Sequence, residues 1–175
     1  AMGTEGPHAT PNSAIIPAHI AVRSLVSLNA VDACVKAVGT PNSTIALWAL
    51  RYMHDPKAVD GLLSAYQRTN DEPLKKQIMI TLARLYKKEA DYDGSWWWST
   101  RPDTHGPYYK SVTWESSPAV KDFLTEEWKK SADKPYFVDL NSRLRLDIPE
   151  FSKEEPVAVK EEVKVDLEKI RNKKG

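Results

Sequence analysis

The sequence has a single cysteine, Cys34, among its 175 residues, so no disulfide can form within the chain. It also lacks the CxxC, CxxCH and His-rich spacings that hold zinc or haem. A chain of this length buries enough apolar surface to fold without a metal ion or a disulfide. We therefore expect no cofactor and no bound metal. Cys34 lies in an apolar helical pattern and is expected to be a small core residue.

Net charge and long apolar runs are lacking as well. Lys and Arg number 25 against 24 for Asp and Glu, so the chain as a whole does not attract nucleic acid. No run approaches the roughly 18 apolar residues that a membrane span requires, and no signal segment opens the chain. Ala1-Met2-Gly3 resembles a cloning scar, and we expect residues 1–12 to be a tag or a disordered N-terminus. Because the chain can be part of a longer precursor, we draw nothing about export from the missing signal.

Internal repetition is the most informative feature that is present. Thr10-Pro11-Asn12-Ser13 returns as Thr40-Pro41-Asn42-Ser43, and residues 30–37 match residues 58–65. Apolar stripes with the helical spacing i, i+1, i+4, i+7 recur in three further segments. These stripes begin at Ala21, Ala46 and Ile78.

Turn-forming residues divide these segments into helix pairs. His54-Asp55-Pro56 and residues 70–73 each place a polar cap before a proline, as at the first turn of a helix. A period of 25 to 32 residues built from one helix pair is typical of a solenoid, since a single pair cannot bury its apolar stripe alone. The tetratricopeptide pattern is missing. We therefore predict an all-α, HEAT-like helical-repeat solenoid of about three helix pairs over residues 13–133.

The third helix pair is interrupted. Its first helix is expected from Glu72 to Ala90, and its second begins at Ser117-Pro118, with an apolar face that includes Trp128. A long Trp-rich loop insertion, residues 91–116, separates them. Residues 134–175 are expected to be an irregular C-terminal extension and linker, because the end of the chain is charged and poor in aromatic residues.

The insertion carries the residues that we assign to binding. It contains four of the six tryptophans, and a long insertion of this composition is more often functional than disordered. Trp and Tyr provide a large contact area and dominate the energetics of protein interfaces. We predict a partner-binding site made of Trp96, Trp97, Trp98, Arg101, Asp103, His105, Tyr108, Tyr109 and Trp114.

Other interpretations of the insertion stay open. The rings can form a local apolar core that caps one end of the helical stack. They can also stack on sugar rings, which would make the chain a carbohydrate-binding module. Asp91 and Asp93 begin an incomplete calcium-loop pattern. Asp103 and His105 form an i, i+2 acid–base pair without a nucleophile motif, so we predict no catalytic residue. His19 and His54 are expected to be structural.

Four segments resemble a known bacterial family. They are ALWALRYMHDP at residues 46–56, ADYDGSWW at 90–97, RPDTHGPYY at 101–109 and VTWE at 112–115. The chain resembles the HEAT-repeat region of large multidomain proteins of planctomycetes and verrucomicrobia. In that family, a propeller-like domain of the membrane-bound-dehydrogenase type precedes the repeats, and a haem-binding cytochrome c domain often follows. The segment from residue 165 to 175 is similar to the approach to that cytochrome domain.

The resemblance implies a place in a larger protein and no chemistry of its own. This sequence contains neither the propeller nor a CxxCH motif, so haem binding and electron transfer are not assigned to its residues. The resemblance implies a non-catalytic spacer or interaction module in an exported, extracytoplasmic protein. Its partners would be the adjacent domains of the same polypeptide or a partner protein, with a carbohydrate as the alternative ligand.

Overall fold

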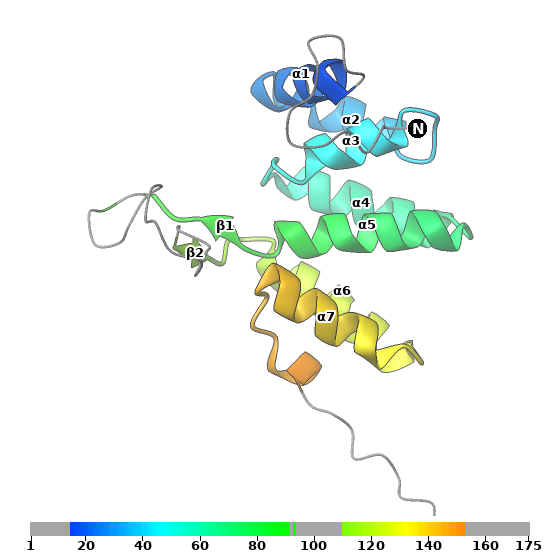
Figure 1. Cartoon of the computed structure of the whole chain (residues 1–175), viewed down its shortest axis with the longest axis vertical. Coiled ribbons are helices and arrows are strands. Elements are labelled where there is room, and N and C mark those ends of the chain that lie inside the picture. Colours follow the sequence, from blue (N-terminus) through cyan, green and yellow to red (C-terminus); the bar gives the residue numbers. More distant parts are fainter. Residues whose placement is uncertain (1–14, 92, 94–109, 153–175) are drawn as a thin grey trace, which may run out of the picture.

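The described chain is a stack of α-helices arranged in two layers (Figure 1). The computed structural model describes residues 15–91, 93 and 110–152. One layer contains α1 (Ile15–Ser27), α3 (Ser43–Leu50), α5 (Glu72–Leu85) and α7 (Lys134–Leu144). The other contains α2 (Val31–Ala37), α4 (Pro56–Arg68) and α6 (Ser117–Lys130). The described residues also form a two-stranded hairpin, β1 (Lys88–Glu89) with β2 (Ser111–Val112), and the 3-10 turn η1 (Pro149–Ser152).

The packing of the helices follows this alternation. In the first layer α1 packs on α3, α3 on α5 and α5 on α7, while α2 packs on α4 in the second. Contacts of α2 with α3, α4 with α5 and α5 with α6 join the layers. The predicted all-α class is confirmed, whereas the HEAT-like nature of the repeats stays a prediction. None of the helices in the described ranges has the length and apolarity needed to cross a lipid bilayer.

Aspartate caps followed by proline begin three of the helices. The carboxylate of Asp55 accepts from the backbone N–H of Lys57 at 2.8 Å, and that of Asp71 from the N–H of Leu74 at 3.3 Å. Both caps lie at predicted helix starts. A side-chain cap satisfies a backbone donor that has no partner within the helix and contributes about 1 kcal/mol.

The third such cap corrects the expectation for the C-terminal part. Asp133 accepts from the backbone N–H of Tyr136 at 3.2 Å and begins α7, so the prediction of an irregular extension from residue 134 is wrong for residues 134–144. The helix is held by an aromatic cluster in which Phe137 and Phe151 pack on Trp128, with ring centroids 5.7 and 5.2 Å from it. Residues 134–152 therefore belong to the packed fold.

The core confirms most of the predicted apolar stripes. The buried set includes Cys34, which is 2 % exposed, as expected for a small core residue. Burial raises the pKa of its thiol. Leu28, the last residue of the first stripe, is by contrast 76 % exposed, because α1 ends at Ser27 before reaching it. The second and third stripes are wholly buried: Ala46, Leu47, Leu50, Met53, Ile78, Met79, Leu82 and Leu85.

Gly61 allows α2 and α4 to approach closely. A Cβ atom at Gly61 would lie 2.5 Å from Cγ1 of Val35 and 3.1 Å from its Cβ. Val is branched at Cβ and cannot easily turn away. The matching position of the preceding repeat is Ala33. Residue 61 is a glycine because the close contact with Val35 leaves no room for a Cβ atom.

We predict that Gly61→Ala destabilises the fold by about 1–3 kcal/mol, the usual cost of overpacking a core. The clash with Val35 outweighs the gain in helix propensity, which is about 1 kcal/mol. Urea unfolding followed by circular dichroism measures the change. The double variant Gly61→Ala/Val35→Ala should lose less stability than the sum of the two single variants. Equal or greater stability of Gly61→Ala would contradict this account of the contact.

Candidate binding surface

A short hairpin forms the base of the Trp-rich insertion. Lys88 pairs with Val112 and Glu89 with Ser111 in antiparallel register, and the backbone N–H of Ala90 donates to the carbonyl of Lys110 at 2.8 Å. Figure 1 shows the hairpin projecting sideways from the end of α5. The two ends of the insertion therefore meet at one point on the edge of the helical stack.

The hairpin replaces the last part of a predicted helix. We expected a helix from Glu72 to Ala90, but α5 ends at Leu85. Three successive backbone carbonyls at this end each accept a hydrogen bond from a distant side chain. The carbonyl of Leu85 accepts from Nε1 of Trp114 at 2.6 Å, that of Tyr86 from Oγ of Ser117 at 2.5 Å, and that of Lys87 from Nε2 of His54 at 3.0 Å. Side chains that are distant in sequence thus donate to the carbonyls that have no partner within the helix.

Trp114 is the one predicted site residue that lies within the described ranges. Its indole ring is partly buried against the core and stands edge-on to His54, with ring centroids 5.4 Å apart. Its backbone N–H donates to Oγ of Ser117 at 2.8 Å. This residue therefore anchors the hairpin, as the local-core interpretation of the insertion expects. The remaining predicted site residues lie outside the described residues: Trp96, Trp97, Trp98, Arg101, Asp103, His105, Tyr108 and Tyr109.

The surroundings of His54 at the same point favour its neutral form. Desolvation by burial lowers its pKa, the hydrogen bond to the Lys87 carbonyl opposes this change, and the charge of Lys88 lowers the pKa further. Because a carbonyl can only accept, Nε2 carries the proton. Both histidines predicted to be structural make ring contacts, since His19 packs edge-on against Trp48 with centroids 4.6 Å apart.

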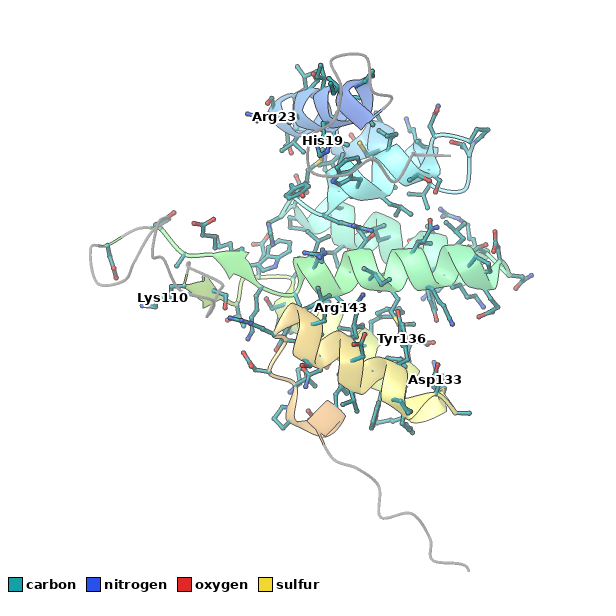
Figure 2. All side chains as sticks on the ribbon, viewed as in Figure 1. His19, Arg23, Lys110, Asp133, Tyr136 and Arg143 are labelled. Carbon is teal, nitrogen blue, oxygen red and sulfur yellow. The ribbon has the colours of Figure 1, made fainter. Side chains whose placement is uncertain are left out.

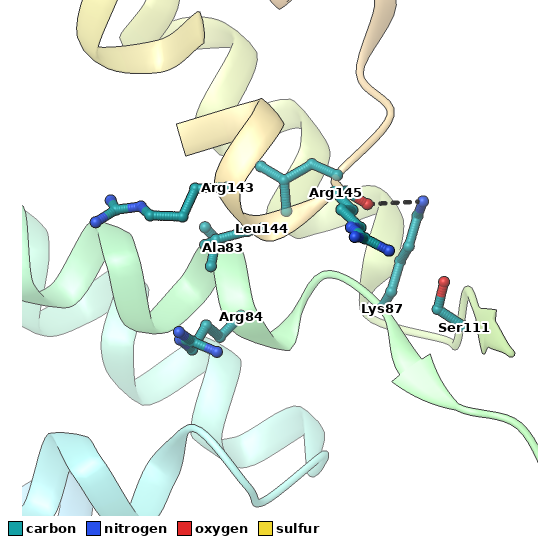
Figure 3. A pocket seen from close by; sticks show the side chains of 8 residues that line it. Ala83, Arg84, Lys87, Ser111, Arg143, Leu144 and Arg145 are labelled. Carbon is teal, nitrogen blue, oxygen red and sulfur yellow. Dashed lines mark hydrogen bonds between the residues drawn. The ribbon is translucent and has the colours of Figure 1, made fainter. Parts of the chain in front are cut away.

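A basic pocket lies beside the base of the hairpin. It has a volume of about 290 Å³, and its wall comes from the ends of α5 and α7 and from strand β2 (Figure 3). Side chains of four basic residues line it, together with Ser111 and an apolar floor. The basic residues are Arg84, Lys87, Arg143 and Arg145.

Part of this charge is neutralised within the protein. Nζ of Lys87 donates to the carboxylate of Asp147 and, at 3.2 Å, to the carbonyl of Arg145. Arg143 lies 3.6 Å from the carboxylate of Asp139, in a pair whose members are both more than half exposed. Among the described residues, no ion pair involves Arg84 or Arg145.

A further arginine, Arg51, lies near Arg84 outside the pocket. Arg51 follows the last residue of α3, Arg84 lies in the last turn of α5 and Arg143 in the last turn of α7. The nearby charge of Arg84, together with desolvation as the larger effect, lowers the pKa of Arg51. An arginine nevertheless keeps its charge in a protein, so like charges face each other along this edge.

Arg145 has an unusual backbone conformation. Its φ is 51° and its ψ 50°, in the left-handed region where glycine is the usual residue. The N–H of Leu146 bonds to the carbonyl of Asn141 at 3.1 Å and that of Arg145 to Ser142 at 3.3 Å, which is the hydrogen-bond pattern of a Schellman helix end. A bulky residue at this position costs roughly 1–3 kcal/mol.

The basic pocket could not be found in the sequence. Its lining residues lie about 60 positions apart and meet only because α7, a helix that we did not predict, packs on α5. Figure 2 shows Arg143 at this end of α7, whereas Asp133 and Tyr136 mark its other end. In the described residues no three His, Cys, Asp or Glu side chains gather in a way that suits a metal ion.

Comparisons with models of protein families, with curated proteins and with solved structures find no match to this chain.

We predict that Trp114→Phe destabilises the fold by about 1–3 kcal/mol, because it leaves the Leu85 carbonyl without its donor while keeping most of the ring. Urea unfolding measures the loss. Tyr52→Phe is a suitable control, since Tyr52 is 61 % exposed and removal of its hydroxyl should change stability little. If Trp114→Phe is as stable as the control, the indole N–H does not anchor the hairpin.

The lowered pKa of His54 predicts a pH dependence of stability. The unfolded state takes up a proton near the ordinary pKa of about 6.5, whereas the folded state takes it up only at lower pH. The free energy of unfolding should therefore fall as the pH decreases from about 7 toward 5. Thermal unfolding at several pH values tests this, and His54→Gln should flatten the profile within that window. An identical profile in the variant would assign the dependence to other groups.

Proposed function

We propose that this chain is a non-catalytic interaction module that binds a neighbouring domain or a partner protein through its Trp-rich insertion. The observation that supports this most directly is the anchored hairpin. It makes the insertion begin and end at one firmly bonded point of the helical stack. Loops that carry recognition residues are commonly positioned by a rigid scaffold in this way.

The surroundings of the hairpin suit a protein partner. Trp, Tyr and Arg are the residues that contribute most to binding at protein interfaces. The sequence of the insertion is rich in Trp and Tyr, and exposed arginines line the pocket beside the base of the hairpin. A carbohydrate-binding module remains the second proposal from the aromatic composition alone. The arginines beside the hairpin carry positive charge, which suits a protein partner better than a neutral sugar.

The context of the module is proposed from the family resemblance. We propose that the helix pairs are HEAT-like repeats within a larger extracytoplasmic protein, and that they hold a haem-carrying redox domain near its partner. The alternation of the helices in two layers supports the repeat assignment. No cofactor is proposed for the chain itself.

The test uses the domains encoded on either side of this chain in the full-length gene. Binding of each domain to the chain is measured by isothermal titration calorimetry. We expect Trp97→Ala and Trp98→Ala to weaken the association at least about 10-fold, as for hot-spot residues, with little change in melting temperature. Trp48→Phe, at a ring distant from the insertion in sequence, is the control.

Each other outcome contradicts the proposal in a recognisable way. A large fall in melting temperature in both Trp variants would favour the local-core interpretation, in which the rings are packed. Trp-dependent binding to an oligosaccharide array, with no association with the flanking domains, would favour the carbohydrate-binding module.

A further inference from the structure

The arginines at the ends of α5 and α7 are not needed to cap those helices. Basic residues often lie in the last turn of a helix, where they interact with free carbonyls and the helix dipole. Here the carbonyls of Leu85 and Tyr86 already accept from Trp114 and Ser117. Those of Asn141 and Ser142 accept from backbone N–H groups. In the described residues, neither Arg84 nor Arg145 takes part in an ion pair, so both guanidinium groups can bind another ligand.

We propose that this basic pocket binds a carboxylate of an acidic segment in the protein partner. The proposal rests on the proposed function and adds the chemistry that the partner presents. Guanidinium groups offer planar pairs of N–H donors that match the two oxygens of a carboxylate. The pocket is lined by three arginines from the ends of two packed helices. Their side chains extend in different directions (Figure 3), so each can pair with a different carboxylate of one acidic segment.

The local charge balance favours an anionic ligand. In the described ranges, two of the pocket's basic residues have an acidic partner: Lys87 is bonded to Asp147, and Arg143 lies 3.6 Å from Asp139. Arg84 also repels Arg51 along the same edge. An incoming carboxylate relieves this repulsion. The whole chain has a net charge of only +1, so an attraction for an anionic ligand at this edge comes from the local arrangement of the arginines and not from the charge of the chain as a whole.

The conformation of Arg145 provides an independent reason. A glycine would adopt φ 51° without strain, yet the chain places an arginine at this helix end. The arginine's side chain lines the pocket beside Lys87 (Figure 3). A residue that is kept at a conformational cost, with its charged group at a cavity, indicates a role for that group.

The size and openness of the pocket argue against a buried small molecule. Pockets for small organic ligands are mostly apolar and measure about 300–1,000 Å³. This pocket is at the lower limit, and Arg84, Arg143 and Arg145 are all exposed. Side-chain carboxylates of an extended segment can reach it from solvent without any opening of the fold.

The test measures binding of two synthetic peptides to the full chain by NMR. An acetylated hexaglutamate peptide is compared with an acetylated hexaglutamine peptide, and inorganic phosphate is titrated separately. We expect the glutamate peptide to shift the signals of Arg84, Ser111 and Arg145, with a dissociation constant that increases with salt. The glutamine peptide should leave these signals unchanged.

Variants assign the binding to the pocket. We expect Arg84→Gln and Arg145→Gly each to weaken binding of the glutamate peptide about 10-fold, the effect of losing one charge-assisted hydrogen bond. The matched control is Arg68→Gln, an exposed arginine in the last turn of α4. Arg145→Gly should also raise the melting temperature by about 2–4 °C through relief of strain, so its loss of binding cannot result from unfolding.

Several results would overturn the proposal. They are equal weakening by Arg68→Gln and Arg84→Gln, equal binding of both peptides, or tighter binding of phosphate than of the glutamate peptide. Absence of any binding by the glutamate peptide at low salt would do the same. If the peptide does not bind but association with a flanking domain still depends on Trp97 and Trp98, only the carboxylate inference fails. If the peptide binds while that association is absent, the proposed function fails instead.

Discussion

The end of α5 is the point on which the described structure depends. The carbonyls of Leu85 and of the two residues after it accept hydrogen bonds from Trp114, Ser117 and His54, which come from two distant regions of the chain. A buried carbonyl without a donor costs about 1–3 kcal/mol, so these bonds fix where the helix stops and where the chain turns into β1. The same helix packs on α3, α4, α6 and α7. One helix end therefore determines both the course of the stack and the position of the insertion.

The parts of the fold that could be predicted are those with local causes. Asp55 and Asp71 each cap a helix within three residues of themselves, and the buried stripes of α3 and α5 repeat with helical spacing. The end of α5 has no local cause. Its donors lie about 30 residues away on either side, and the residues up to Ala90 are compatible with a helix until those donors are considered. Helix α7 was missed although its start has an aspartate closely followed by proline, as at the two recognised caps, and although Phe137, Leu140 and Leu144 have helical spacing.

One part of the candidate binding surface could be predicted from the sequence and the other could not. The aromatic insertion is visible in the sequence because its composition differs from that of its surroundings. The arginine-lined pocket is not visible, since Arg84 and Arg145 line the same pocket only through the packing of α7 on α5. The position of Trp114 depends equally on tertiary structure. In the sequence it is one more ring of the insertion, but its N–H is used inside the fold. Composition identified the segment, and only the packing shows that Trp114 anchors it.

The end of α5 supports both the hairpin and the basic pocket. The hairpin is attached to α5 through Trp114, and Lys87, at the same helix end, donates to the carbonyl of Arg145 and to Asp147. The pocket and the base of the insertion are therefore held in one arrangement before any partner arrives. Association is weakened by the ordering of side chains and loops, and this arrangement removes part of that ordering. An acidic segment bound by the arginines would therefore lie beside the base of the insertion, at a position that the end of α5 already determines.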